Sequence, residues 1–276
     1  MSFKAKLRAS EDANGSLLCL GLDPEPDLLP PGIDRSPAGI ARFVSAIVES
    51  VGDAVSSYKL NLAFYERWGR EAGWLLDQAL AALPKERPVI LDAKRGDVGS
   101  TAQAYAHALF EAWGADAVTV HPYLGYDSLA PFLAHKEKEV FIVCRTSNPG
   151  ATEFQHLRSD GEALYRHVAR AAVRWDRHDN VGLVVGATAP AELRDVRQIA
   201  GDRLLLVPGI GAQGADLAAA VRAALREDGR GAIIPISRGI LFASAGEDHA
   251  AAARESALRY RDAINALRPQ PASAPA

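Results

Sequence analysis

The sequence of 276 residues contains only two cysteines and few lysines, and it has no long apolar run. Cys19 and Cys144 lie inside apolar segments, where a thiol is more often a small core residue than half of a disulfide or a metal pair. No segment approaches the ~18 apolar residues that span a bilayer, and residues 1–15 lack the apolar core of a secretory signal. We therefore expect a reduced, cytoplasmic protein that has no membrane partner.

The balance of charge argues against a general nucleic-acid-binding protein. With 31 basic and 34 acidic residues the formal net charge is -3, whereas a general nucleic-acid binder is normally strongly basic. Hydrophobic residues make up 48% and charged residues 24%, which is ordinary globular usage. Only seven basic residues are lysines, in a chain that otherwise uses arginine. Lys59 and Lys94 are notable because they lie within strand-like segments.

Short apolar segments alternate with longer amphipathic ones along the chain, which predicts alternating strands and helices. The predicted strands are 17–22, 54–60, 88–93, 117–121, 140–145, 181–186, 203–207 and 232–237. The predicted helices are 37–51, 66–83, 100–113, 128–138, 161–177, 190–199, 216–227 and 249–267.

Eight strands, each followed by a helix, indicate an α/β protein with a single-domain (β/α)8 TIM barrel over residues 1–267. The alternative is an open, doubly wound sheet, because alternation alone does not prove that the sheet closes. Residues 268–276 are rich in proline and alanine, and we expect them to form a disordered tail.

A set of alternating charges lies at the ends of two neighbouring predicted strands. Asp92 and Lys94 are two residues apart, so on a regular strand both side chains point to the same face. Lys59 ends the preceding strand and Asp97 follows closely, at the barrel end where active sites gather. Lys94 is the candidate proton donor, because an amine can deliver a proton to carbon at neutral pH and a guanidinium cannot. The alternatives are a structural Asp92–Lys94 ion pair and a Lys59 side chain that reaches out to solvent.

The segment 208–214 (PGIGAQG) formally matches the G-x-G-x-x-G pattern of dinucleotide sites. The next strand ends at Ser237 and Arg238 instead of a ribose-binding acid, which disfavours that interpretation. The loops after strands seven and eight of such barrels frequently bind phosphate. Backbone N–H groups of the glycine loop, the Gln213 amide and the Arg238 guanidinium would suit a phosphate dianion.

Two further strand ends are polar. Asp23 precedes Pro24, which is also common turn chemistry. Residues 145–150 (RTSNPG) offer hydrogen-bonding groups for a polar heterocycle, or they form only a capped turn. The sequence shows no plausible Ser-His-Asp triad and no HExxH motif, and His121 is better explained as a packed junction residue than as a ligand.

Residues 92–101 (DAKRGDVGST) resemble the D-x-K-x-x-D signature of the orotidine 5′-phosphate decarboxylases, in their longer bacterial, type 2 branch. Other segments agree in order and spacing, so the resemblance covers nearly the whole chain. They are LGLDP at 20–24, YKLNLAFYE at 58–66, RTSNPGA at 145–151, VPGIGAQG at 207–214 and SRGI at 237–240. Leu60 departs from the pattern, because proline often follows this lysine.

The resemblance implies a homodimer that converts orotidine 5′-phosphate to UMP and CO2 in pyrimidine biosynthesis, without a metal or an organic cofactor. It implies that Lys94 protonates C6, that Asp92 lies beside the scissile carboxylate, and that Lys59 orients Asp92 and contacts the ribose. Asp97, Val98 and Thr101 would reach into the partner subunit's site. The remaining implied substrate contacts are Asp23 with the ribose, Ser147 with the pyrimidine, and Gln213 and Arg238 with the phosphate, with Gly239 beside them.

Two alternatives remain. One is a magnesium-dependent sugar-phosphate lyase of the same superfamily, such as hexulose-phosphate synthase, which carries an acid at the position of Lys59. The other is a non-catalytic barrel that binds a phosphorylated ligand.

Overall fold

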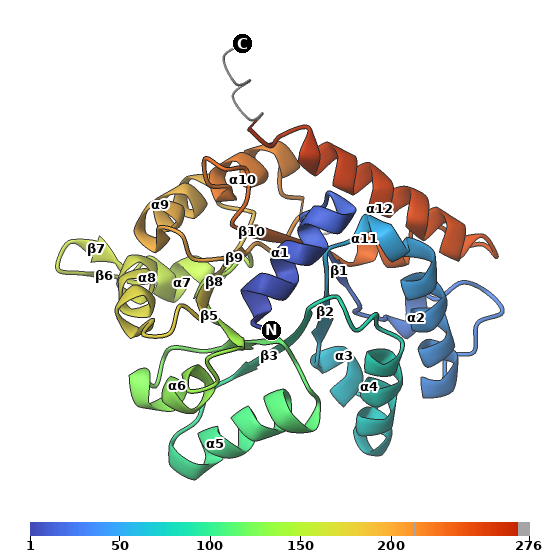
Figure 1. The fold of residues 1–276 in the computed structure, drawn as a ribbon, viewed down its shortest axis with the longest axis horizontal. Coiled ribbons are helices and arrows are strands. Elements are labelled where there is room, and N and C mark those ends of the chain that lie inside the picture. The colour runs from blue at the N-terminus through green and yellow to red at the C-terminus, as the bar shows by residue number, and fades with distance from the viewer. Residues whose placement is uncertain (212–213, 270–276) are drawn as a thin grey trace.

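A computed structural model describes residues 1–211 and 214–269. Eight parallel strands close into a barrel in the order β1-β10-β9-β8-β5-β4-β3-β2 (Figure 1). The strands are β1 (Leu18–Gly21), β2 (Ser57–Asn61), β3 (Val89–Arg95), β4 (Ala117–Val120), β5 (Glu139–Arg145), β8 (Val181–Val185), β9 (Leu205–Leu206) and β10 (Ala232–Ile236). Closure confirms the predicted (β/α)8 barrel and excludes the open sheet.

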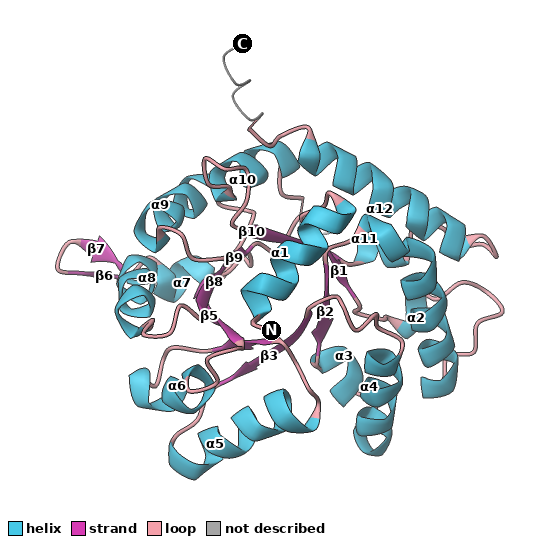
Figure 2. Cartoon of the chain, viewed as in Figure 1, coloured by secondary structure: helices cyan, strands magenta, loops and turns pink. Residues whose placement is uncertain are grey.

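An outer ring of helices covers the barrel (Figure 2). The longer ones are α2 (Pro37–Val51), α4 (Ala72–Ala81), α5 (Gly99–His107), α6 (Tyr126–Leu133), α8 (Leu164–Trp175), α9 (Pro190–Ala200), α10 (Leu217–Ala224) and α12 (His249–Asn265). Short helices α3 (Ala63–Glu66), α7 (Ala151–Gln155) and α11 (Arg238–Leu241) follow β2, β5 and β10. None of the helices in the described residues is long and apolar enough to cross a membrane.

Some predicted elements differ from those observed. The predicted helix 66–83 is interrupted, because Gly69 has a left-handed φ of 56° and α4 begins only at Ala72. The predicted helix 161–177 begins at Leu164, after a small hairpin of β6 (Arg158–Ser159) and β7 (Glu162–Ala163). The predicted helix 100–113 ends in a π-helical turn over Ala108–Ala112.

Helix α1 (Phe3–Asn14) was not predicted, and it lies across one end of the barrel (Figure 1). Its apolar side is narrow: Phe3 and Leu7 are buried and join the cluster inside the barrel. The Phe3 ring meets the ring of Phe141 edge to face, with centroids 5.9 Å apart. Since so few apolar residues make this contact, helical periodicity in the sequence is weak.

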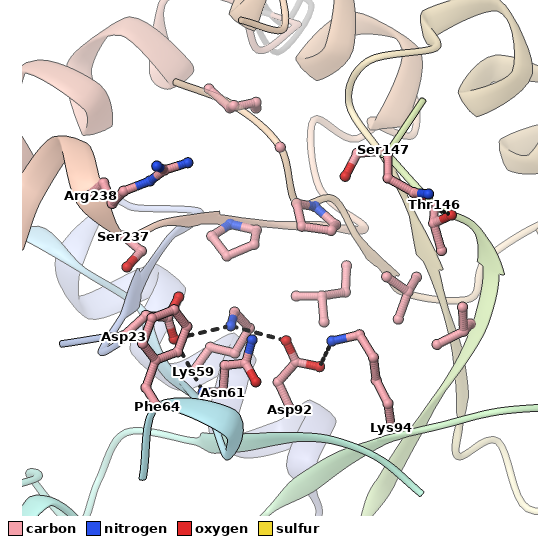
Figure 3. A pocket seen from close by; sticks show the side chains of 18 of the residues that line it. Asp23, Lys59, Asn61, Phe64, Asp92, Lys94, Thr146, Ser147, Ser237 and Arg238 are labelled. Carbon is pink, nitrogen blue, oxygen red and sulfur yellow. Dashed lines mark hydrogen bonds and ion pairs between the residues drawn. The ribbon is translucent and has the colours of Figure 1, made fainter. Parts of the chain in front are cut away.

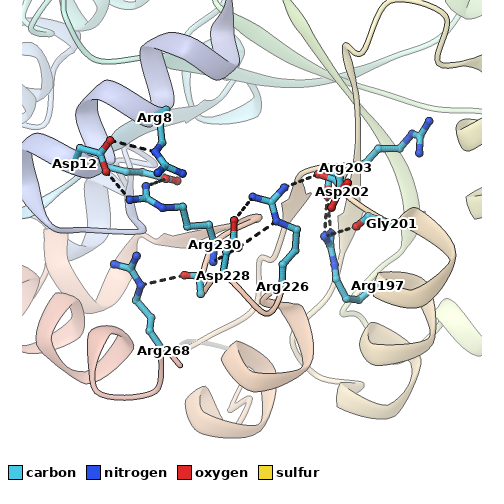
Figure 4. A network of polar contacts seen from close by, with 12 residues as sticks. Arg8, Asp12, Arg197, Gly201, Asp202, Arg203, Arg226, Asp228, Arg230 and Arg268 are labelled. Atoms are coloured by element: carbon cyan, nitrogen blue, oxygen red, sulfur yellow. Dashed lines mark hydrogen bonds and ion pairs between the residues drawn. The ribbon is translucent and has the colours of Figure 1, made fainter. Parts of the chain in front are cut away.

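Arg230 ties α1 to a loop far along the chain (Figure 4). Arg230 binds Glu11 at 2.8 Å and also binds Asp12, both on α1. Arg268 donates to the Gly229 carbonyl at 3.0 Å, which anchors the chain after α12. These two arginines therefore serve structure at this end of the chain. Residues 270–276 of the predicted tail lie outside the described residues.

Candidate active site

A cavity of about 650 Å³ opens at the carboxyl ends of the strands (Figure 3). Apolar side chains from four strands or strand ends form part of its lining: Val143, Val184, Leu206 and Pro235. Asp23 and Lys59 lie on one side of the cavity, and Thr146 and Ser147 lie across from them. The cavity thus combines an apolar lining with a few converging polar groups, as small-molecule sites do.

Four of the lining residues form a chain of alternating charge. The Lys59 Nζ atom lies 3.6 Å from Asp23 Oδ1 and 3.1 Å from Asp92 Oδ2. The Lys94 Nζ atom lies 2.6 Å from Asp92 Oδ1. The Lys59 side chain is only 7% exposed, whereas that of Lys94 is 41% exposed. Lys59 is therefore enclosed by carboxylates, and Lys94 is the ammonium that a ligand can reach.

Burial and the neighbouring charges shift the pKa values of Lys59 and Asp92 in opposite directions. Burial lowers the pKa of Lys59, but the carboxylates of Asp23 and Asp92 outweigh it and hold that pKa above its usual value. Burial likewise raises the pKa of Asp92, but Lys59 and Lys94 outweigh it and hold that pKa well below its usual range. Both groups are consequently ionised at neutral pH.

The geometry that joins Asp92 to Lys94 is not the predicted one. The pairing of β3 with β4 shifts between Leu91 and Arg95, and Lys94 has a left-handed φ of 47°. Regular alternation along β3 was therefore the wrong reason for expecting the two side chains together. They meet because a bulge changes the direction of the backbone after Asp92.

Sequence reasoning missed Asn61 and Phe64, which also line the cavity. Asn61 lies two residues after Lys59 on β2, so the period of two could have identified it. Its backbone N–H donates to Asp23 Oδ1 at 3.2 Å, which fixes the carboxylate at the end of β1. Phe64 follows on α3, and like Asn61 it lies within the segment 58–66 that carries the resemblance, although neither was singled out there.

Ser147 lines the cavity as predicted, together with Thr146, which was not singled out. Both lie across the cavity from Asp23 and Lys59 (Figure 3). Gln155 of α7 holds Thr146 twice, by accepting from its backbone N–H at 2.9 Å and donating to its hydroxyl at 2.8 Å. The loop after β5 is thus held in place by its own helix.

At another side of the cavity, Arg238 and Ser237 follow β10 and Gly209 follows β9. The Arg238 side chain is half exposed and lies 3.9 Å from Glu25, so its guanidinium is available to an anion. Gly239 lies next along the chain and packs against Tyr260, whose hydroxyl would be 2.7 Å from an added Cβ. Gln213 lies outside the described residues.

Asp97, Val98 and Thr101 follow β3, and as far as the described residues define it they are not part of the cavity lining. The Asp97 carboxylate accepts from the Val98 N–H at 2.7 Å, and the Val98 residue is 51% exposed. The structure therefore brings Asp23, Lys59, Asp92, Lys94, Ser147 and Arg238 together, and it leaves these three at the surface of the chain.

Residues 16–255 match the family described as the orotidine 5'-phosphate decarboxylase / HUMPS family. The chain belongs to this family. Asp92 and Lys94 of the D-x-K-x-x-D segment line the cavity, whereas Asp97 of the same segment is not among its lining residues.

Proteins of known name are similar to this chain over nearly its whole length. A protein of Roseiflexus sp. (strain RS-1) named orotidine 5'-phosphate decarboxylase is 51% identical over 268 residues, which cover 96% of this chain and 98% of that one. A solved structure described as Leishmania donovani OMP decarboxylase has a TM-score of 0.87 and 40% identity, covering 97% of this chain and 99% of that one. Leishmania donovani UMP synthase also matches, with a TM-score of 0.86 and 41% identity; 97% of this chain aligns with 57% of that longer chain.

Proposed function

We propose that this protein is a carboxy-lyase that converts orotidine 5′-phosphate to UMP and CO2 in pyrimidine nucleotide biosynthesis. The observation that carries this conclusion is the Asp23–Lys59–Asp92–Lys94 chain of charges at the cavity, in a member of this family. Similar proteins named for this activity align over nearly the entire chain.

Lys94 and Asp92 carry the chemistry. In the proposed reaction the bond from C6 to the carboxylate breaks, and CO2 leaves while the electron pair stays on C6. The Lys94 ammonium then gives its proton to C6, which yields UMP, and the amine regains a proton from solvent. Because negative charge develops on C6, a fixed ammonium stabilises the transition state more than the ground state.

Lys59 keeps Asp92 ionised and oriented, and it reaches the ribose together with Asp23. Ser147 would bind the pyrimidine edge. Arg238 and Gln213 would bind the phosphate, with Gly239 beside them; the half-exposed Arg238 guanidinium at the cavity supports this part. Binding energy at the phosphate, remote from the breaking bond, then holds the ring against Lys94.

We also propose that two subunits complete each site. Asp97, Val98 and Thr101 would enter the partner subunit's cavity, which fits their position outside their own. Exposed apolar residues lie in the nearby segments, with Tyr123 exposed by 92% and Leu124 by 48%. A second copy of the chain is the partner that would cover them.

The main alternative is the magnesium-dependent sugar-phosphate lyase. Lys59 argues against it, because its ammonium already lies between the carboxylates of Asp23 and Asp92 and would repel a divalent cation. A cytoplasmic location is proposed as well, since Cys19 and Cys144 are free and buried. Residues 1–267 would form the catalytic domain.

The test follows ultraviolet absorbance while purified protein is incubated with orotidine 5′-phosphate, with chelator in one arm and added magnesium in another. The proposal predicts the same turnover in all arms. Activity that chelator abolishes and magnesium restores would support the metal-dependent lyase. Tight UMP binding without turnover would support the non-catalytic barrel.

A further inference from the structure

Thr119 of β4 lies opposite the bulge in β3. Leu91 pairs with Val118 and Arg95 pairs with Val120, so three residues of β3, 92–94, face the single residue Thr119. Asp92 and Lys94, which form an ion pair at the cavity, are both within this bulge. Thr119 itself is fully buried, with no exposed surface.

The Thr119 hydroxyl connects these two residues. Its Oγ1 atom accepts from the Lys94 backbone N–H at 2.9 Å and donates to Asp92 Oδ1 at 2.8 Å. Asp92 Oδ1 is also the atom that the Lys94 ammonium contacts at 2.6 Å. The hydroxyl thus makes one bond to the backbone of the proton donor and one to its carboxylate partner.

The backbone at Lys94 needs such support. A left-handed φ of 47° is unfavourable for a residue with a side chain, and it persists only where the surroundings fix it. The bulge also interrupts the regular β3–β4 ladder here. The Thr119 hydroxyl supplies a hydrogen-bond acceptor for the Lys94 N–H at this point.

We propose that Thr119 is a positioning residue for the decarboxylation, an inference that rests on the proposed function. Its hydroxyl fixes the Lys94 backbone relative to the Asp92 carboxylate, and this holds the ammonium where C6 will lie. Thr119 does not touch the substrate. It acts through the placement of Lys94, so removal of the Thr119 hydroxyl affects proton delivery more than nucleotide binding.

The test compares Thr119→Val, which keeps the shape and removes the hydroxyl, with Thr119→Ser, which keeps the hydroxyl. Thr119→Ala is a second hydroxyl-free variant should Val at this position fold poorly. Thr152→Val is the matched control, because within the described residues its exposed hydroxyl bonds only the Pro149 carbonyl. For each variant kcat, KM, inhibition by UMP and Tm are measured.

The expected result for Thr119→Val is a kcat lower by about 10- to 100-fold, the effect of losing a hydrogen bond to a charged group. Its KM and its inhibition by UMP should change by less than about threefold, since the Thr119 hydroxyl does not touch the nucleotide. Thr119→Ser should retain kcat within about threefold. Small changes in KM and in UMP inhibition are expected because both hydrogen bonds of the hydroxyl are to protein groups and neither is to the nucleotide.

Two outcomes would overturn the proposal. One is a hydroxyl-free variant with unchanged kcat. The other is a parallel loss of kcat, UMP affinity and Tm that Thr119→Ser does not rescue, since that pattern marks a purely structural residue. Wild-type protein that fails to consume orotidine 5′-phosphate would instead refute the proposed function, so the two failures are distinguishable.

Discussion

The Lys59 ammonium offsets the repulsion between two neighbouring carboxylates. It lies between Asp23 and Asp92, whose side chains are only 14% and 11% exposed. Without it, both carboxylates would face each other with little solvent to screen them. Lys59 and Lys94 together hold the pKa of Asp92 well below its usual range.

We expect Lys59→Met to lower kcat/KM by at least about a hundredfold, because breaking a buried ion pair leaves an uncompensated charge. The exposed Lys136→Met is the control, since it makes the same chemical change at the surface. Steady-state decarboxylation assays of both variants decide the matter. A Lys59→Met enzyme within tenfold of the wild type would contradict the assigned role.

Glu139 is a titratable residue at the amino end of β5, distant from the proposed chemistry. It is 1% exposed, and its Oε1 atom has no hydrogen-bond partner among the described residues. Burial raises the pKa of this carboxyl from 4.5 to about 8. The folded state therefore binds a proton that the unfolded state has released at intermediate pH.

This predicts a stability that falls as pH rises from about 4.5 to about 8, since the native state binds more protons in that window. Glu139→Gln should remove the decline, and at pH 8 it should raise the free energy of unfolding by on the order of a few kcal/mol. At pH 4.5 the two proteins should differ much less. Urea unfolding at both pH values checks this, with exposed Glu137→Gln as the control. Equal pH dependence in Glu139→Gln and wild type would refute it.

At the scale of elements, the loop after β5 and helix α7 act together. Ser147 would bind the pyrimidine, and the adjoining Thr146 is held by both the acceptor and the donor of the Gln155 side-chain amide. Because α7 is only five residues long, its contribution lies in this contact more than in its own stability.

We predict that Gln155→Leu weakens inhibition by UMP about tenfold or more, because two hydrogen bonds that fix the loop are lost. Inhibition by ribose 5-phosphate, which lacks the pyrimidine, should stay within about twofold, since the loop after β5 would contact only the ring. Exposed Gln198→Leu on α9 is the control. An equal loss of affinity for UMP and for ribose 5-phosphate would contradict this prediction, because it would indicate a general disturbance of the site.

The elements were predictable where apolar periodicity determines them. Helix α2 begins and ends as its sequence indicates, with Ser36 accepting from the Gly39 N–H and Pro37 at the first position. The bulge at Lys94 was not predictable, because it depends on register with β4 and not on the β3 sequence. Helix α1 was missed because only Phe3 and Leu7 are apolar anchors among its buried residues.

At the scale of the whole molecule, the alternation of eight strands with helices favoured a barrel but left an open sheet possible, and only the structure shows that the sheet closes. The strand ends located most of the charged site. Asp23, Lys59, Asp92 and Lys94 come from three strands or their ends and still converge. Asp97 and Thr101 could not be placed by the same reasoning, since they are not among the residues that line the cavity and their proposed role involves a second chain.

The shared site can be tested by mixing Lys94→Ala and Asp97→Ala subunits, each of which we expect to be inactive on its own. If a site takes Lys94 from one chain and Asp97 from the other, a mixed dimer regains one intact site. About a quarter of the wild-type activity should return at equal mixing, because random exchange makes half of the dimers mixed and each carries one site. No recovery after confirmed subunit exchange would count against Asp97 acting in trans.

The central claim is that Lys94, held by Asp92, completes a decarboxylation of orotidine 5′-phosphate. It is tested most directly by incubating wild-type and Lys94→Ala protein with this nucleotide, following ultraviolet absorbance and identifying the product. The account predicts rapid conversion to UMP by the wild type and a loss of at least about a thousandfold in Lys94→Ala, with its fold intact. A folded wild-type dimer that leaves the nucleotide unchanged, or a fully active Lys94→Ala enzyme, would contradict it.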